Sequence, residues 1–428
     1  MYLNLGWGAP VVDWIEPEMR RSNVRRERLD RAADLGREPR VDDLVDMQYL
    51  LAVFSGLKVH KGQAAGPDGA RPSDVGTQEM ARALRKVRAA ILDGTWRPGP
   101  TRAQKIPKDN GETRTLQIPN VLDRVIFAGL QKLMAPFWEH TFLDGSHGSR
   151  PRRSHLTLLA DLETAIMEEH LFIVATDDVE KAFDSAHIDT VVAAHELYVS
   201  GTTLLTFINT VLRGKNPRRT IGIDQGNAYS PTALNVLMHD AIDKHTAQSP
   251  DMQDLLWMRY VDNIVYATKS MTDGRQALQT ATRLLNQVHL NLKGEDGDPR
   301  DIHKDPVDLL GFTIKTPQDE IVYAPHRKAW EKLDQALMDC HESNNPTDTA
   351  RNTIRGWLNA MGPAAENLTE ADLKRIRDTA ESNGHRRLIS IESLRKVANR
   401  SHSEWRWLQR KRHRERLHLE RPRCTLQG

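Results

Sequence analysis

Residues 171–184 read LFIVATDDVEKAFD, an uninterrupted apolar run that leads directly into paired acids. The first part, residues 171–175, is a short continuous apolar segment, which favours a strand buried at the centre of a sheet. Asp177 and Asp178 would then lie at the carboxyl end of that strand. The stretch therefore predicts a strand that delivers carboxylates to one edge of a sheet.

A second stretch, WMRYVDNIVY at residues 257–266, has extended character on both sides of Asp262 and Asn263, which indicates a β-hairpin with an acid at its tip. Carboxylates on adjacent strand ends, such as Asp178 and Asp262, can converge on one site. Mg²⁺ prefers such oxygen ligands and leaves positions for substrate phosphates. Two such ions can activate a hydroxyl and stabilise a leaving pyrophosphate. Acids at strand ends are more often solvated turn residues, so this interpretation depends on the motifs around them.

The composition narrows the class of protein. The chain has 428 residues, of which 60 are Lys or Arg and 58 are Asp or Glu, for a net charge of +2. That length is room for two or three domains at roughly 100–200 residues each. No stretch approaches the roughly 18 apolar residues of a membrane helix, and residues 1–20 lack the pattern of a signal peptide. Two cysteines, Cys340 and Cys424, cannot make a disulfide framework, so we expect a cytoplasmic protein.

The small net charge conceals a strongly basic end. Residues 385–423 contain 13 Lys or Arg and four Glu, a net charge of +9. Such a surface can neutralise phosphates, although a charge run alone is more often a solvated helix face. Trp405 and Trp407 lie within the run, where they could stack on bases or dock on the rest of the protein.

Local patterns predict mixed helices and strands followed by a helical region. We expect an amphipathic helix over residues 80–92 and a hairpin that turns at residues 109–111. After residue 312 the pattern becomes helical. Three residues mark expected helix starts in that region: Pro325, Pro346 and Thr369.

Seven motifs follow one another in register between residues 64 and 360. They are Ile106-Pro107-Lys108-Asp109-Asn110-Gly111-Glu112-Thr113-Arg114, Ser149-Arg150-Pro151-Arg152-Arg153-Ser154, Asp178-Val179-Glu180-Lys181-Ala182-Phe183-Asp184, Gln225-Gly226 with Ser230-Pro231, Tyr260-Val261-Asp262-Asn263, Leu310-Gly311-Phe312 and Ile354-Arg355-Gly356-Trp357. In this order they resemble the motifs of bacterial reverse transcriptases of the group II intron-like lineage. Each motif is weak alone, and the shared register makes coincidence very improbable.

The resemblance implies a right-hand polymerase of the α/β (α+β) class. An N-terminal helical extension would cover residues 1–62, and fingers and palm with an antiparallel palm sheet would cover 63–316. A helical thumb would follow over 317–384 and a basic C-terminal helical tail over 385–428. The implied activity is that of an RNA-directed DNA polymerase, which adds dNTPs to a primer 3′-hydroxyl on an RNA template.

The resemblance also implies roles for individual residues. Asp178 and Asp262, with the Val179 carbonyl, would bind two Mg²⁺ ions, and Asn263 would complete the catalytic motif. The nucleotide would be bound by Lys108, Arg114, Phe183, Gln225 and Gly226, with the Phe183 ring as the gate that excludes a 2′-hydroxyl. Lys293 stands near the family's general-acid lysine. Nucleic acid would be bound by Arg150, Arg152, Arg153, Gly311, Arg410, Lys411 and Arg412.

The sequence departs from the family at informative positions. Asn263 replaces an aspartate, which removes a negative charge beside the metals; we expect weaker Mg²⁺ binding or a shift towards Mn²⁺. Ser230-Pro231 disfavours the error-prone enzymes of diversity-generating elements. No His/Cys cluster of an endonuclease follows the thumb. By analogy alone, this favours an enzyme of the abortive-infection and defence-associated kind that acts on a partner noncoding RNA.

Two other functions remain open. One is an untemplated or protein-primed DNA polymerase, for which Tyr198, Tyr229 or a tyrosine of the N-terminal extension could supply the priming hydroxyl. The other is a catalytically weak, maturase-like RNA-binding protein, favoured by Asn263. A homo-oligomer or an accessory protein is compatible with each function.

Overall fold

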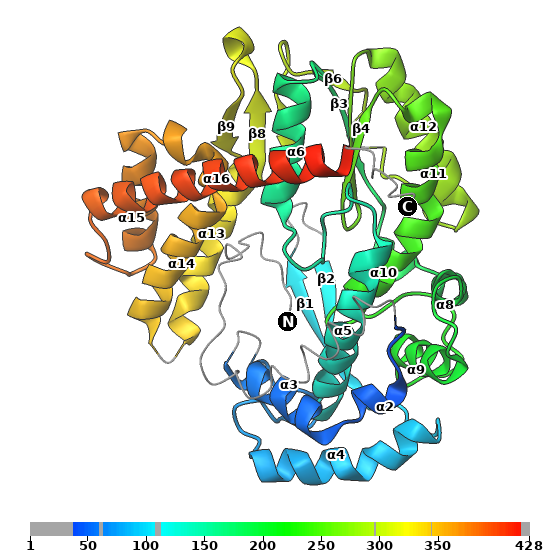
Figure 1. Ribbon diagram of the computed structural model, residues 1–428. Coiled ribbons are helices and arrows are strands. Elements are labelled where there is room, and N and C mark those ends of the chain that lie inside the picture. Colours follow the sequence, from blue (N-terminus) through cyan, green and yellow to red (C-terminus); the bar gives the residue numbers. More distant parts are fainter. Residues whose placement is uncertain (1–36, 60–62, 108–112, 295–296, 344, 421–428) are drawn as a thin grey trace, which may run out of the picture.

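The computed structural model describes residues 37–59, 63–107, 113–294, 297–343 and 345–420 (Figure 1). Helices and antiparallel sheets are mixed along the chain, which confirms the expected α+β class. Within these residues no helix combines the length and the apolar character that a membrane crossing requires.

The central sheet has four strands in the order β4–β5–β3–β6, and its strand pairs are antiparallel. The expected buried strand is β3 (Ile173–Asp178), which starts two residues late and runs through both acids. The expected hairpin is β4 (Leu256–Tyr260) and β5 (Asn263–Thr268), joined by a tight turn. The short edge strand β6 covers Arg300–Asp301.

Helices on both faces bury this sheet. Helix α12 (Met271–Gln287) packs against β3 and β5, and α6 (His155–Met167) packs against β4 and β5. Most of α6 is buried because a second long helix, α16 (Ile391–Glu420), crosses it on the outside (Figure 1).

Helices and a two-stranded sheet make up most of the rest of the described chain before β4. The hairpin expected around residues 109–111 is β1 (Thr101–Pro107) paired with β2 (Thr113–Pro119). The helices are α2 (Val41–Leu44), α3 (Met47–Val59), α4 (Thr77–Leu92), α5 (Val121–Thr141), α7 (Ala182–Ser185), α8 (Ile188–Glu196), α9 (Thr202–Arg213), α10 (Ser230–Met238), the π-helical η2 (His239–Asp243) and α11 (Lys244–Gln248). Helix α4 contains the helix expected over residues 80–92.

The C-terminal helical region follows a three-stranded sheet, β7 (Val307–Leu309), β8 (Phe312–Lys315) and β9 (Val322–Pro325). Pro346 is the first residue of α14 (Pro346–Ala360), and Thr369 caps α15 (Glu370–Ser382) in a capping box with Asp372, as expected. Pro325 is instead the last residue of β9. Helix α13 (Arg327–Asp339) begins after it because His326 supplies the N-terminal cap.

Two apolar cores cross the expected domain boundaries. One core joins Leu44 and Phe54 of the expected N-terminal extension to residues of α5 and the central sheet. The other joins α6 and β8 to the C-terminal helices and includes Trp405 of α16. The described parts of both end segments are therefore packed together with the middle of the chain. The division at residues 62 and 384 stays a prediction.

Helix α16 is fixed to the central region by buried charges. The Arg412 guanidinium, 2% exposed, forms ion pairs with Asp161 of α6 at 2.5 Å and Asp144 at 2.9 Å. Burial alone would raise the pKa of Asp144, but Arg153 and Arg412 outweigh it, so that pKa is lowered. The expectation that Arg412 contacts nucleic acid is therefore wrong in this structure, because its donors bind protein carboxylates.

The exchange of Arg412 tests how much this contact stabilises the fold. Arg412→Ala leaves the buried Asp161 carboxylate without its arginine partner, while Asp144 keeps Arg153, so we expect a loss of about 3–5 kcal/mol in the free energy of unfolding. Urea unfolding measures it. The matched control is Arg410→Ala on the exposed side of the same helix, expected to change stability by less than about 0.5 kcal/mol. Equal losses in both variants would contradict the assignment.

Candidate active site

A tight turn presents Asp262 at the end of the central hairpin. Tyr260 pairs with Asn263, so Val261 and Asp262 alone form the turn. Val261 has a φ of 60°, a left-handed conformation that is strained for a β-branched residue. Asp178 pairs with Asn263 on the neighbouring strand. The end of β3 and the turn of the hairpin therefore meet at one edge of the sheet, as the sequence predicts.

A buried arginine holds this turn. Arg259, 1% exposed, pairs with Asp243 of η2 at 2.6 Å and donates to the Val261 carbonyl at 2.7 Å. It also donates to Asn235 of α10 at 2.8 Å. A Cβ on Gly148 would lie 2.3 Å from the Val261 nitrogen, so only glycine fits against the back of the turn. The strained conformation persists because these contacts determine it.

Both oxygens of the Asp178 carboxylate have protein donors. The Asn263 side-chain amide donates to Oδ1, and the Lys293 ammonium lies 2.7 Å from Oδ2. The side chain of Asp178 is 33% exposed, so it remains accessible to a ligand. The neighbouring Asp177 points elsewhere: its carboxylate accepts from the backbone nitrogens of Asp178 and Gly294.

Asp262 is held in a different electrostatic state. Burial, and after it the nearby Asp178 carboxylate, raises the pKa of Asp262 to about 6, while the charges of Arg114 and Lys293 oppose the shift. Arg114 lies on β2 and is exposed. Its charge thus acts on the Asp262 carboxyl, and its expected role in binding the triphosphate stays a prediction. Lys108, its expected companion, lies outside the described residues.

The motif Gln225-Gly226 lies between β2 and the turn after β3. The Gln225 carbonyl accepts from the Gln117 nitrogen at 2.7 Å, and the Gln225 side-chain amide lies 3.4 Å from Asp184. Gly226 has a φ of +118°, and a Cβ there would lie 2.4 Å from the Gln117 carbonyl oxygen. The close approach that requires glycine is therefore to β2, and it positions Gln225 near the expected sugar gate, the half-buried Phe183.

The expected nucleic-acid residues are spread over several environments. Arg150 is 8% exposed, pairs with Glu139 and donates to two backbone carbonyls, and Arg153 pairs with Asp144. These two support the loop before α6, contrary to expectation, because their guanidiniums bind protein oxygens. Arg152 is exposed, and Gly311 lies in the β7–β8 turn with a φ of +93°.

The oxygen atoms at this edge of the sheet are candidate ligands for a hydrated divalent ion. Among the described residues no group of three or more His, Cys, Asp or Glu side chains could hold a metal. Asp178, Asp262 and the Val179 carbonyl offer oxygen ligands from two strands, with Val179 fixed by its nitrogen bond to the Asp262 carbonyl. Mg²⁺ commonly takes one or two carboxylates and completes its shell with water and phosphate, so these residues fit that ion.

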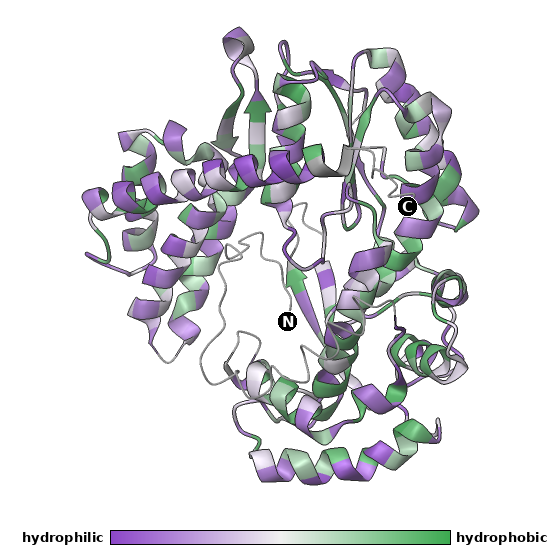
Figure 2. Ribbon diagram, viewed as in Figure 1, coloured by the Kyte–Doolittle hydropathy of each residue, from purple (hydrophilic) through white to green (hydrophobic). Residues whose placement is uncertain are grey.

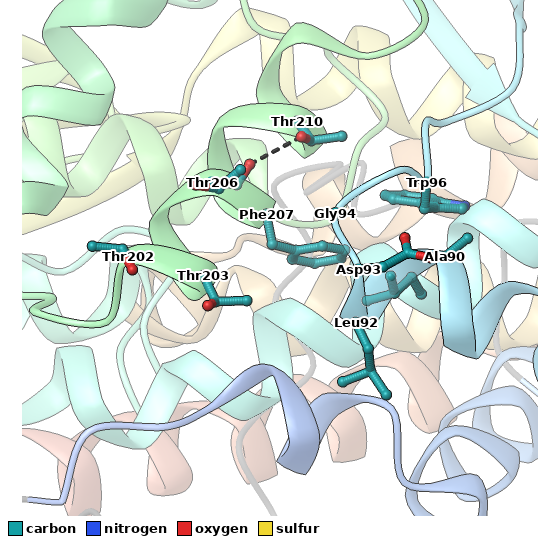
Figure 3. Close-up of a pocket in the computed structure, with 11 residues that line it drawn as sticks. Ala90, Leu92, Asp93, Gly94, Trp96, Thr202, Thr203, Thr206, Phe207 and Thr210 are labelled. Carbon is teal, nitrogen blue, oxygen red and sulfur yellow. Dashed lines mark hydrogen bonds between the residues drawn. The ribbon is translucent and has the colours of Figure 1, made fainter.

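A cavity of about 240 Å³ lies apart from these acids (Figure 3). It lies between the end of α4 and α9, with four threonine side chains on α9 and a stacked Trp96–Phe207 pair. None of the expected catalytic residues lines it.

Comparison with known proteins identifies the region that holds the acids. Residues 106–314 match the family model described as reverse transcriptase (RNA-dependent DNA polymerase). This part of the chain is similar to a reverse transcriptase domain. The match runs from the end of β1 into β8, and it therefore includes both acids, Arg114 and Gln225.

Curated relatives place the domain among group II intron-like sequences, as the motifs indicated. The chain is 27% identical over 172 residues to the group II intron-encoded protein LtrA of Lactococcus lactis, covering 39% of this chain and 28% of that protein. It is 29% identical over 170 residues to the protein YkfC of Escherichia coli, covering 38% of this chain and 45% of that protein. The chain thus spans less than half the length of these relatives.

Two features of the reverse transcriptase site were not foreseen from the sequence. Arg259 and its partner Asp243 escaped notice, although an arginine within an otherwise apolar strand is a signal of a buried ion pair. The contact of Lys293 with Asp178 was also missed, because it depends on the path of the chain after α12. The roles of the expected nucleotide-binding residues stay predictions.

The raised pKa of Asp262 predicts how metal binding depends on pH. Below about pH 6 the carboxyl holds a proton that a divalent ion must displace, so the Mn²⁺ affinity falls by up to about tenfold per pH unit as the pH decreases. Above the pKa the affinity is constant. Mn²⁺ titration followed by electron paramagnetic resonance between pH 5 and 8 measures this. Asp262→Asn is expected to abolish the step; a wild-type affinity without pH dependence would contradict the prediction.

Proposed function

We propose that the protein is an RNA-directed DNA polymerase that extends a primer 3′-hydroxyl with dNTPs. The observation that carries the proposal is the meeting of Asp178 and Asp262 at one sheet edge, within a reverse transcriptase domain. Asp178 stays accessible beside Asp262, with the Arg114 charge nearby. A scaffold with no catalytic role would not require this combination.

The chain's own residues would contribute position and charge to the reaction. Asp178, Asp262 and the Val179 carbonyl would hold Mg²⁺ or Mn²⁺, which supplies charge stabilisation to the hydroxyl and the pyrophosphate. Arg114 would bind the triphosphate and offset the charge that develops on it. Gln225 and Phe183 would contact the nucleotide from the other side. Most of the rate enhancement would come from this alignment.

The outer face of α16 is proposed as a path for the RNA template. Its exposed side chains Lys396, Arg400, Trp407, Arg410 and Arg414 recur at helical spacing on one face, and Figure 2 shows the helix as mostly hydrophilic. Lys411, 40% exposed, pairs with Glu415 at 3.9 Å and lies 5.4 Å from the Trp407 ring centre. Within the described part of the chain, neither Arg410 nor Arg414 has a carboxylate within 4 Å. The Arg414 guanidinium donates only to the Arg410 backbone carbonyl, at 3.1 Å. Two arginines without a carboxylate partner among the described residues, beside a half-exposed tryptophan, suit phosphates and a stacked base.

The biological setting is proposed on family resemblance alone. We propose a partner noncoding RNA as template, DNA as product, a role in antiviral defence and a cytoplasmic location.

Two of the tyrosines considered as primers for a protein-primed enzyme are poorly placed. Tyr229 is fully buried and bonded to His195, and the Tyr198 hydroxyl is buried as well. The geometry therefore favours a nucleic-acid primer over these two side chains.

The decisive measurement uses the full chain purified with its bound nucleic acid. Labelled dNTPs with Mg²⁺ or Mn²⁺ should be incorporated, and Asp178→Asn should lose incorporation by more than about 100-fold, because a metal ligand is removed. RNase treatment before the assay should also abolish it. RNA binding should persist in the variant. Equal incorporation in both proteins would overturn the assignment, and tight RNA binding with no incorporation under either metal would favour the maturase-like function.

Substitutions on α16 test the proposed template path. Arg410→Ala with Arg414→Ala should weaken RNA binding and reduce the slope of log affinity against log salt by about 1–2, since up to two phosphate contacts are lost. Trp407→Ala should weaken binding without changing that slope, because stacking releases no counterions. Fluorescence anisotropy at several salt concentrations measures both.

The matched control for this test removes two cations from α15, Lys374→Ala with Arg377→Ala, which pair with Glu370 and Asp378. It should leave affinity and slope unchanged. If the α16 variant behaves like the α15 variant, RNA does not contact this face. Truncation of the tail is unsuitable, because Trp405 and Arg412 are part of the folded interior.

A further inference from the structure

The segment after α12 is fixed beside the catalytic strand by its backbone. The Glu180 nitrogen donates to the Asn291 carbonyl at 2.8 Å, and the Lys293 nitrogen donates to the Asp178 carbonyl at 2.9 Å. The Gly294 nitrogen donates to the Asp177 carboxylate at 3.0 Å. Three bonds thus hold residues 291–294 along the end of β3, so the position of the Lys293 side chain follows from the fold.

The Lys293 ammonium lies where a cation bound to Asp178 would be expected. It is 2.7 Å from Oδ2, while Asn263 occupies Oδ1. Its charge also reaches Asp262, whose pKa is raised by burial and Asp178 and is lowered in part by Arg114 and Lys293. A divalent ion that binds these carboxylates must therefore compete with a positive charge that the protein itself supplies.

This contact is exchangeable. The Lys293 side chain is 34% exposed, and lysine carries a compact charge on a flexible stem of four carbons. A triphosphate brings several anionic oxygens, which bind an ammonium at least as well as one carboxylate does. The fixed backbone would let the ammonium change partners without movement of β3.

We propose that Lys293 occupies the cation position at Asp178 until a nucleotide arrives, and that its transfer to the triphosphate frees Asp178 for the divalent ion. This proposal deepens the proposed polymerase function and rests on it. It assigns Lys293 a part in metal loading, before the reaction, which is separate from proton donation during it. Metal and nucleotide would then bind with positive coupling, for which factors of roughly 5 to 150 are typical.

The test measures metal binding by the full chain without nucleotide. Mn²⁺ alone is titrated and the free ion is followed by electron paramagnetic resonance. Lys293→Met removes the competing charge and keeps the length of the side chain, so it should bind Mn²⁺ at least fivefold more tightly than the wild type. The control, Lys374→Met, removes an equivalent exposed ion pair with Glu370 on α15 and should match the wild type. Lys293→Gln serves as a second variant with the same expected direction.

A second measurement addresses the exchange itself. In the wild type, the Mg²⁺ concentration for half-maximal incorporation should fall as dNTP rises from below to above half-saturation. In Lys293→Met this dependence should be weaker by the same factor that separates the two nucleotide-free affinities. Any direct contact between metal and nucleotide is the same in the wild type and in Lys293→Met. The difference between the two proteins in how the Mg²⁺ requirement depends on dNTP therefore reports the contribution of Lys293.

The outcomes separate this proposal from the polymerase assignment. If the wild type incorporates dNTPs but Lys293→Met and Lys293→Gln gain less than fivefold in Mn²⁺ affinity, the proposed part of Lys293 is wrong and the polymerase assignment stands. If Asp178→Asn binds Mn²⁺ as the wild type does and no protein incorporates dNTPs, both are wrong.

Discussion

The buried ion pair of Arg259 with Asp243 is the contact on which the edge of the sheet with Asp178 and Asp262 depends. Arg259 is 1% exposed and donates to the side chains of Asp243, Asn235 and Ser146 and to the Val261 carbonyl. A buried guanidinium is costly unless its donors are paired. Because the partners come from η2, α10, the loop before α6 and the turn itself, these elements can pack only in the arrangement that places Asp262 beside β3.

The loop before α6 also connects the turn that holds Asp262 to the C-terminal helix α16. Its backbone pairs with Arg259 on both sides, through the Gly145 carbonyl and the His147 nitrogen. Its Asp144 accepts from Arg412 of α16. The contacts are therefore continuous from the strained Val261 to a helix more than 130 residues away in the sequence. Strain at a functional turn persists where surrounding contacts are this complete.

The sequence predicted the local elements well where one short pattern decides them. The apolar run of residues 171–175 and the acids after it indicate β3, and Thr369 with Asp372 indicates the start of α15. The sequence could not separate exposed from buried arginines where positive charge was the only signal. Arg410 and Arg412 are two residues apart in one basic run, yet Arg410 is exposed and Arg412 is buried against Asp161. Only the tertiary position of an acid 251 residues away distinguishes them.

The charges of the site compensate one another within the protein. Carboxylates close together repel each other and favour protonation, and Asp262 shows this repulsion in its raised pKa, after the effect of burial. Asn263 replaces a further acid with a donor, and Lys293 supplies a positive charge, so both oxygens of Asp178 are satisfied. This arrangement relieves the repulsion between the carboxylates. An ion that binds Asp178 would have to displace these contacts. The pairing of Lys293 with Asp178 that stabilises the site would therefore oppose metal binding until Lys293 gains another partner.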